Sequence, residues 1–370
     1  MTGTGQTDAA AGPPNESERS PAAAWLSRVW WQARPGWGAL ALLPLAALYR
    51  AAAWLQAAAY RRGWKTTEKV PVPVLVVGNL IVGGAGTTPT VIALVQALRA
   101  AGWTPGVISR GYGRDDGNGE MPMPVRTDST ATAVGDEPLL IALRTGVPVW
   151  VGRRRAAVAR ALCAAEPAVD LIVSDDGLQH RALARRAQVI VFDERGAGNG
   201  LLLPAGPLRE PLPAQVPAAS VVLYNAPSPS TPLPGWRAER RLAGAVSLAG
   251  WWRGEPASLA ALHALRGTEV LAAAGLASPE RFFTMLEAEG LHIRRLPLPD
   301  HHRYTQAPWP TGSGDVLITE KDAVKLRPDP GNASATGGAG PHIWVVALDF
   351  HLPPDFIHAV LSLLGPPPSP

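Results

Sequence analysis

The chain has 370 residues, 34 of them basic and 30 acidic, with 46% hydrophobic side chains and a single cysteine. This length and hydrophobic fraction predict one large or two medium globular domains and exclude a wholly disordered chain. Cys163 alone excludes a disulfide framework and a cysteine-built zinc site, which favours an intracellular protein, and a net charge of +4 over this length gives no reason to expect nucleic acid.

The first two segments have contrasting compositions. Residues 1–24 are poor in large apolar side chains, so we expect a disordered tail without a secretory signal. Residues 25–66 hold several tryptophans and a stretch of almost pure Ala and Leu, interrupted by Pro44 and Arg50. Its continuous apolar run is about half of the roughly 20 residues that a spanning helix needs, so we expect a membrane-associated helix at the interface. An Ala-rich helix packed on the protein itself is the alternative.

From residue 67 onward, short apolar runs alternate with helical runs. The predicted strands are 72–77, 107–109, 147–151, 169–174, 189–193 and 220–224, and the predicted helices between them are 89–101, 138–144 and 154–165. Continuous apolar strands separated by helices are typical of a parallel sheet covered on both faces. We assign residues 67–245 to this core.

A second, smaller α/β domain is predicted for residues 246–370. Its expected strands and helices are 269–273, 279–289, a strand near 293, 316–319, 343–347 and 354–364. The order of elements again favours a sheet with helical cover.

A glycine-rich loop, Gly83 to Gly86, lies between the first predicted strand and the first predicted helix. Successive backbone N–H groups in such a loop and at the following helix N-terminus point to one place, where a phosphate binds well. A tight structural turn is the alternative. The loop departs from the P-loop pattern because Ile81 stands at the first glycine and Thr87 at the lysine, whereas Thr88 keeps the hydroxyl that such loops offer to Mg²⁺.

Asp175 and Asp176 follow the predicted strand 169–174 directly. Open α/β sheets place their ligands at the carboxyl ends of strands, and an Asp at this position commonly holds Mg²⁺ in nucleotide-using enzymes. An ordinary Asp-Gly turn would explain Asp176 but not a carboxylate pair followed by Gln179 and His180.

Motifs along the chain resemble those of the tetraacyldisaccharide 4'-kinase family of lipid A biosynthesis. They are Val77 to Pro89, Ser109-Arg110-Gly111-Tyr112-Gly113, Gly135-Asp136-Glu137-Pro138, Asp175 to His180, Leu203 to Glu210, Asp300-His301 and Thr319 to Lys325. The resemblance covers roughly residues 37–364. It implies an α/β fold in which a P-loop NTPase-like parallel sheet core carries a smaller C-terminal α/β domain and an N-terminal apolar membrane-associated helix.

The resemblance also implies an activity. It is the ATP-dependent phosphorylation of the 4'-hydroxyl of a tetraacyldisaccharide 1-phosphate lipid A precursor, with ATP and Mg²⁺ as cofactors. The implied location is the cytoplasmic face of the bacterial inner membrane, and neither nucleic acid nor a protein partner is implied.

The same resemblance implies roles for single residues. The phosphates of ATP would be bound by Gly83, Gly84, Ala85, Gly86, Thr87 and Thr88, and the metal would be held by Thr88, Asp175, Asp176 and Glu210. Substrate contacts would come from Arg110, Tyr112, Arg154, Gln179 and Arg209. Asp136 and His301 would meet across the cleft as the catalytic base, one orienting the other.

Without the family, several of these residues have simpler interpretations. Asp136 would equally be a helix N-cap, and His301 would more often be an ordinary loop histidine. Glu320 and Lys321 would form structural ion pairs at a helix start or act directly.

Thr87 leaves three explanations open. An arginine substitutes for the lysine, with Arg110 the best candidate; the enzyme is slow; or the chain is a pseudo-kinase that binds nucleotide or lipid without turnover. The retained set of metal and base residues favours an active enzyme.

Overall fold

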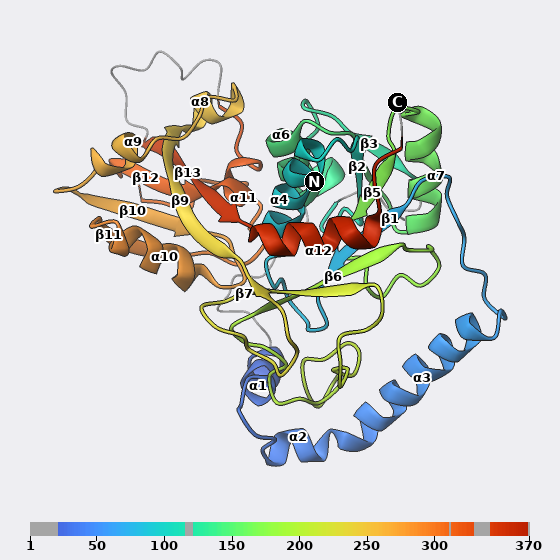
Figure 1. Ribbon diagram of the computed structural model, residues 1–370. Coiled ribbons are helices and arrows are strands. Elements are labelled where there is room, and N and C mark those ends of the chain that lie inside the picture. Colours follow the sequence, from blue (N-terminus) through green and yellow to red (C-terminus); the bar gives the residue numbers. More distant parts are fainter. Residues whose placement is uncertain (1–20, 115–120, 311, 329–340, 369–370) are drawn as a thin grey trace, which may run out of the picture.

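A computed structural model describes residues 21–114, 121–310, 312–328 and 341–368. Residues 1–20 of the expected disordered tail lie outside this set, and the remaining four belong to a helix, α1 (Pro21–Trp30). Figure 1 shows two sheets side by side, with α1, α2 (Trp37–Ala41) and α3 (Leu43–Arg61) extending from one end of the molecule.

The first sheet has eight strands in the order β3-β4-β2-β5-β1-β6-β7-β8. Their bounds are β1 (Val74–Gly78), β2 (Pro105–Ser109), β3 (Met123–Val125), β4 (Val149–Val151), β5 (Leu171–Ser174), β6 (Ala187–Asp193), β7 (Ser220–Asn225) and β8 (Trp236–Arg237). Only β3, antiparallel to β4, departs from parallel pairing in this sheet as described. The predicted α/β fold with a parallel sheet is confirmed.

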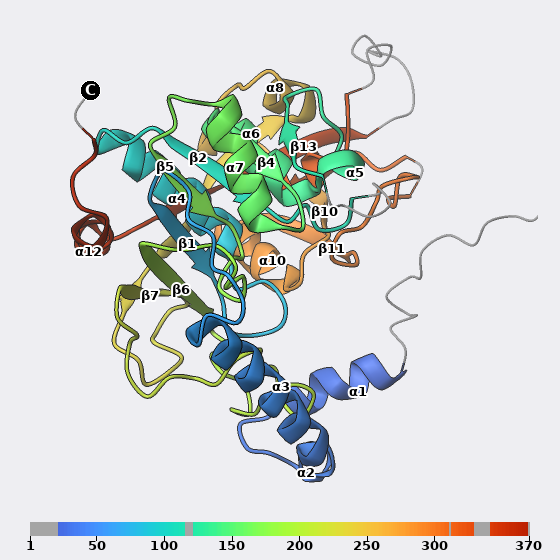
Figure 2. The same cartoon turned by 90° about the vertical axis from the view of Figure 1, so that its right-hand side faces the viewer.

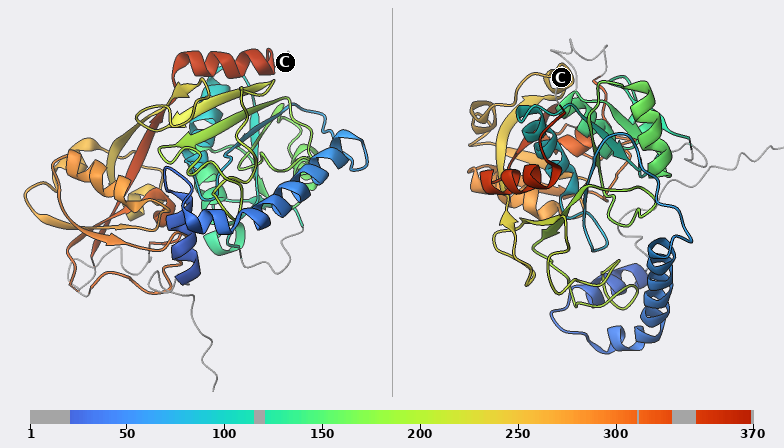
Figure 3. Two further views of the ribbon diagram at one scale, coloured as in Figure 1. Left: turned by 90° about the horizontal axis from the view of Figure 1, so that it is seen from below. Right: turned by 45° about the vertical axis from the view of Figure 1, so that its right-hand side comes forward.

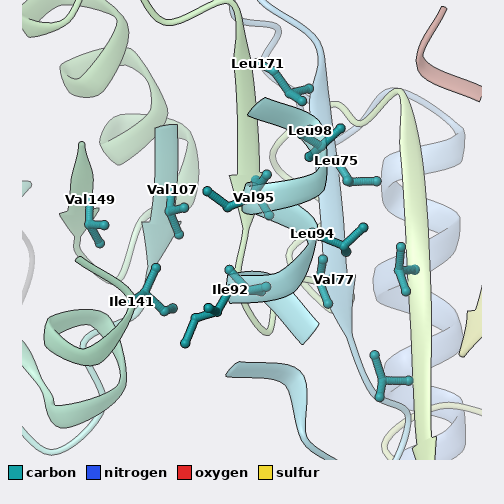
Figure 4. Close-up of a cluster of buried hydrophobic side chains, with 14 of the residues drawn as sticks. Leu75, Val77, Ile92, Leu94, Val95, Leu98, Val107, Ile141, Val149 and Leu171 are labelled. Carbon is teal, nitrogen blue, oxygen red and sulfur yellow. The ribbon is translucent and has the colours of Figure 1, made fainter. Parts of the chain in front are cut away.

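Helices cover both faces of the first sheet because its strands are apolar on both sides. Leu75 and Val77 of β1 pack into one core, and Val74 and Val76 pack into the other, as expected where successive side chains alternate. The helices on the first face are α4 (Thr87–Ala100), α5 (Ala131–Val134), α6 (Asp136–Thr145) and α12 (Pro354–Leu364), and α7 (Arg155–Ala165) lies on the second. Figure 4 shows α4 side chains packed against β1 and its neighbours.

The second sheet has five strands in the order β11-β10-β12-β13-β9. They are β9 (Glu239–Ser247), β10 (Glu269–Ala274), β11 (His292–Pro297), β12 (Asp315–Thr319) and β13 (His342–His351), and β9 runs antiparallel to β13. The accompanying helices are α8 (Leu248–Trp252), α9 (Leu259–His263), α10 (Pro279–Ala288) and α11 (Glu320–Ala323). This sheet forms the expected second α/β unit.

The boundary between the two units differs from the prediction in two ways. The expected break after residue 245 falls inside β9, which belongs to the second sheet from Glu239 onward. In addition, α12 returns to the first sheet, as Figures 1 and 2 show. Phe356, Val360 and Leu364 lie one turn apart on one face of α12, so the helix needs an apolar partner, which it finds in the first core.

The N-terminal helices contact the body through a few polar bonds. The indole of Trp30 donates to the carbonyl of Pro204 at 2.8 Å, and Tyr49 Oη donates to the carbonyl of Arg209 at 2.9 Å. Otherwise α2 and α3 expose apolar side chains along the edge of the molecule seen in Figure 3, including Trp37 at 88% and Leu48 at 68% exposure. None of the helices described here is both long and apolar enough to cross a membrane.

Candidate functional site

A cavity of about 970 Å³ lies between the carboxyl end of the first sheet and the second sheet. The loop after β1, the start of α4 and the residues following β2 and β5 line one side, and segments after β10, β11 and β12 line the other. Ligands of open α/β sheets bind at this end of the strands. The cavity therefore brings chemistry-bearing residues from distant parts of the chain together.

The glycine-rich loop after β1 is held by hydrogen bonds from two side-chain amides. Asn79 Nδ2 donates to the carbonyl of Gly83 at 2.9 Å, and Asn225 Nδ2 donates to that of Ala85 at 3.1 Å. Gly86 precedes α4 with a left-handed φ of 86° and, in this part of the structure, no side chain caps the helix. The first N–H groups of α4 are thus left for a ligand, as a phosphate site requires.

Asp175 and Asp176 lie at the end of β5, beside this loop. Ser109 Oγ donates to Asp175 Oδ2 at 3.1 Å, whereas buried Oδ1 of Asp175 has no hydrogen-bond partner among the described residues. Burial, and then the charges of Glu137 and Asp176, raise the pKa of Asp175 to about 7. An orphaned carboxylate oxygen in a cluster of negative charge fits a divalent cation.

Glu210 does not join this pair. Its carboxylate accepts from Arg181 Nη2 at 2.7 Å and lines a separate small hollow. The preceding Arg209 faces the cavity instead, because the chain bends at both residues and directs their side chains to different sides. Across the described ranges, no group of three or more His, Cys, Asp or Glu side chains is arranged to hold a metal ion.

Arg209 and Gln179 meet at the aspartate pair. Nη1 of Arg209 lies 3.2 Å from Asp176 Oδ2 and donates to Gln179 Oε1 at 3.2 Å. Arg110 and Tyr112 also line the cavity, and both are exposed. These predicted substrate residues therefore face one space.

Arg154 does not line the cavity, and the prediction for it is wrong by one residue. Arg154 is exposed at the start of α7, whereas the next residue, Arg155, is buried and lines the cavity. Its guanidinium donates to the carbonyls of Gly152 and Asp175, and burial lowers its pKa to about 10. In a cluster of three arginines, only the helix phase decides which side chain points inward.

Asp136 and His301 come together although 165 residues separate them. Nδ1 of His301 lies 2.9 Å from Oδ2 of Asp136, while Oδ1 of Asp136 accepts from the backbone N–H of Glu137. Asp136 is buried behind His301, which lines the cavity and has a positive φ of 61°. The predicted pair is therefore formed, with the imidazole on the cavity side.

The two partners shift each other's pKa. Burial alone would raise the pKa of Asp136, but the hydrogen bond to His301 and the charge of Lys321 hold it well below its usual range. Burial lowers and the hydrogen bond to Asp136 raises the pKa of His301, with a net increase. The carboxylate thus stays charged and makes the imidazole a stronger base.

Glu320 and Lys321 form ion pairs at the start of α11, one of the two roles expected for them, although their partners lie on other elements. Glu320 accepts from Arg144 at 2.5 Å, and Lys321 Nζ lies 3.1 Å from Glu137 and 3.0 Å from Asp300. These ion pairs join α11 to α6 and to the loop after β11. Arg240 of β9 lines the cavity as well and was missed from the sequence, because no strand was predicted between residues 224 and 269.

Comparison with known proteins agrees with the resemblance. Residues 38–365 match the family model described as tetraacyldisaccharide-1-P 4'-kinase. The tetraacyldisaccharide 4'-kinase of Methylibium petroleiphilum is 52% identical over 357 residues, covering 96% of this chain and 98% of the relative. That of Leptothrix cholodnii is 52% identical over 344 residues, covering 92% and 96%.

A solved structure shares the fold. The crystal structure of LpxK from Aquifex aeolicus in complex with ATP superposes with a TM-score of 0.69 at 24% identity, covering 88% of this chain and 99% of that one. The family model and the two relatives match nearly the whole chain. The chain belongs to the tetraacyldisaccharide-1-P 4'-kinase family.

Proposed function

We propose that the protein transfers the γ-phosphate of ATP to the 4'-hydroxyl of a tetraacyldisaccharide 1-phosphate lipid A precursor. The observation that carries this proposal is the pair Asp136 and His301 in the same cavity as the glycine-rich loop. A phosphate site and a polarised imidazole in one enclosed space are what transfer to a hydroxyl requires.

ATP binds with its phosphates on the loop Gly83 to Gly86 and on the uncapped start of α4, including Thr87 and Thr88. The A. aeolicus relative was crystallised with ATP, which supports this ligand. Mg²⁺ would be held by Thr88 Oγ1, Asp175 and Asp176 together with phosphate oxygens, a ligand set of the kind Mg²⁺ accepts without an all-protein cage. Bound there, it would neutralise charge on the transferred group.

His301 receives the proton of the sugar hydroxyl. Nδ1 is occupied by Asp136, so Nε2 is the nitrogen left for the substrate, 3.7 Å from Asp300 Oδ2. Asp136 orients the ring and favours its protonated form, the role that a carboxylate has beside a catalytic histidine. The ion pairs of Lys321 with Glu137 and Asp300 hold this arrangement in place.

The lipid headgroup lies beside Arg110, Tyr112, Gln179 and Arg209. Guanidinium groups bind phosphate oxygens in a bidentate manner, and the proposed substrate carries a 1-phosphate. Tyr112 packs against the His301 ring with centroids 5.1 Å apart, so it is placed to contact the sugar that the imidazole deprotonates.

The acyl chains stay with the membrane while the headgroup enters the cavity. The exposed tryptophans and leucines of α2 and α3 would lie in the lipid interface, at the cytoplasmic face of the inner membrane. Tyr49 connects α3 to Arg209, so the membrane-facing helix is tied to a residue of the cavity.

The deciding experiment measures transfer of labelled phosphate from ATP to a purified tetraacyldisaccharide 1-phosphate acceptor. We expect product with the natural chain and, with His301→Ala, a loss of at least about 100-fold. ATP binding without product above this variant would instead identify a pseudo-kinase and refute the proposal.

A further inference from the structure

The loop that binds the phosphates lacks its usual cation. P-loops carry a lysine after the last glycine, whose ammonium group reaches the β- and γ-phosphates. In this chain Thr87 follows Gly86, and neutral threonine cannot supply that charge. Another cation must do so if the loop is to bind ATP in the ordinary way.

Arg240 reaches this loop from the second sheet. A Cβ atom added to Gly86 would lie 3.4 Å from Nη2 of Arg240, so the guanidinium sits against the residue that begins α4. Arg240 also lines the cavity, and it belongs to β9, the strand that carries the chain from the first sheet to the second. Figure 1 shows β9 passing between the two units.

The guanidinium of Arg240 is shielded from solvent and forms no hydrogen bond or ion pair within the described part of the chain. Its Nε is buried without a hydrogen-bond partner among the described residues. Burial lowers the pKa of Arg240, and the nearby charge that opposes this shift is the carboxylate of Asp193. That carboxylate already pairs with Arg195 through Oδ2 at 2.7 Å. A shielded guanidinium without its own counter-ion is costly, and a phosphate would offset that cost.

Other cations of the cavity are engaged elsewhere. Their partners are Glu320 for Arg144, the carbonyls of Gly152 and Asp175 for Arg155, Asp176 for Arg209, Glu194 for Arg281, and Glu137 with Asp300 for Lys321. Arg110 follows β2, and β5 lies between β2 and β1, the strand that leads into the glycine-rich loop.

Arg195 also lies close to the loop, but its bonds assign it another role. It donates to the carbonyl of Gly84 at 2.7 Å, pairs with Asp193 and packs over the Trp31 ring at 4.7 Å. A side chain that binds a loop carbonyl stabilises the loop and leaves the phosphate contact to another group.

We infer that Arg240 takes the place of the P-loop lysine and binds the terminal phosphates of ATP from the second sheet. The inference rests on the proposed function for its ligand. It also means that bound ATP contacts both units of the protein, because the glycine-rich loop comes from the first sheet and the cation from the second.

The test compares nucleotide binding by Arg240→Ala and by a matched control. The control is Arg241→Ala, because the adjacent Arg241 pairs with Glu239 at the surface, where an ion pair contributes little. We expect the Kd for ATP with Mg²⁺ to rise roughly 10- to 100-fold in Arg240→Ala, and the Kd for AMP, which lacks the β- and γ-phosphates, to stay unchanged.

A rescue experiment separates charge from folding. Thr87→Lys in the Arg240→Ala background restores the charge from the ordinary position and should recover at least about tenfold in Kd. The inference is overturned if Arg240→Ala binds ATP like the natural chain, or if ATP and AMP weaken equally and Thr87→Lys recovers nothing.

These outcomes are distinct from a failure of the proposed function. The binding measurement needs no lipid acceptor, so a chain that binds ATP through Arg240 but yields no phosphorylated lipid would refute only the kinase activity. A chain that phosphorylates the lipid at the natural rate with Arg240→Ala, at subsaturating ATP, would refute only the role of Arg240.

Discussion

Nδ1 of His301 lies 2.9 Å from Oδ2 of Asp136, and this contact joins the start of α6 on the first sheet to the loop after β11 on the second. The proposed base therefore exists only while the two units keep their relative position. The ion pair between Arg144 of α6 and Glu320 of α11 supports that position from the same helix. Catalysis and the packing of the two units are thus coupled.

Asp136→Asn should lower the phosphate-transfer rate by at least about 100-fold and change its pH dependence. Asp136 raises the pKa of His301, and His301 must be neutral to accept a proton. The rate of the natural chain should therefore rise with pH through this raised pKa. Without the carboxylate the pKa of His301 falls, so the inflection in kcat should move to lower pH.

His301→Gln is the companion variant, since the glutamine amide can still hydrogen-bond Asp136 but cannot titrate. Its residual rate should lack this inflection altogether. If the inflection stays at the same pH in Asp136→Asn, or persists in His301→Gln, another group is the base.

Asp175→Asn should stabilise the metal-free protein while reducing phosphate transfer. The folded-state pKa of Asp175 is raised to about 7, above an unfolded value near 4, so its charge costs stability increasingly as pH rises from about 4 to about 7. Asparagine removes that cost and still accepts from Ser109. At pH 8 in a chelator, each kcal/mol recovered should raise Tm by about 2–4 °C.

The same variant should lose the stabilisation that Mg²⁺ with ATP gives the natural chain. Asp176→Asn is the control for the Tm gain in the chelator, because Asp176 is half-exposed and hydrogen-bonds Arg209. As a second proposed Mg²⁺ ligand, Asp176 should be needed for the stabilisation by Mg²⁺ with ATP as well. Equal or lower Tm for Asp175→Asn than for the natural chain would contradict the burial argument.

Gly86→Ala should impair both folding and ATP binding. Gly86 has φ 86°, which an L side chain rarely adopts, and an added Cβ would lie 2.0 Å from Nδ2 of Asn225. We expect a loss of at least about 1–2 kcal/mol in the free energy of unfolding and weaker ATP binding by titration. Gly84→Ala is the matched control, because its Cβ would meet nothing within 4 Å. Similar losses in both variants would refute this account.

Much of the fold was predictable because it depends on local patterns. Apolar runs such as 169–174 marked the strands, and a loop or carboxylate directly after such a run had to lie at the carboxyl edge of the sheet. This is why the glycine-rich loop and Asp175 were placed correctly from sequence. The contact of Asp136 with His301 came from the family resemblance, since no spacing predicts it.

The errors have a common physical origin. Arg154 and Glu210 were each chosen from motifs in which an adjacent residue, Arg155 or Arg209, faces the cavity. Which neighbour points inward depends on helix phase for Arg154 and on a bend of the loop for Glu210, and both are set by packing at distant positions. Arg240 was missed for another reason: a strand that starts with charged residues has no apolar pattern to reveal it.

The last prediction concerns the apolar surface of α3. Deleting the N-terminal helices would also remove Tyr49 from Arg209, so a point substitution tests membrane binding more cleanly. Leu55 is 58% exposed and the next residue, Gln56, is exposed as well. Leu55→Glu should reduce sedimentation with vesicles of mixed zwitterionic and anionic phospholipid by about tenfold or more, because an apolar side chain leaves the lipid.

Gln56→Glu adds the same charge without removing apolar surface, so it should bind nearly as well as the natural chain. Equal binding by all three proteins would mean that α3 does not enter the lipid, and equal loss in both variants would mean that charge alone controls binding.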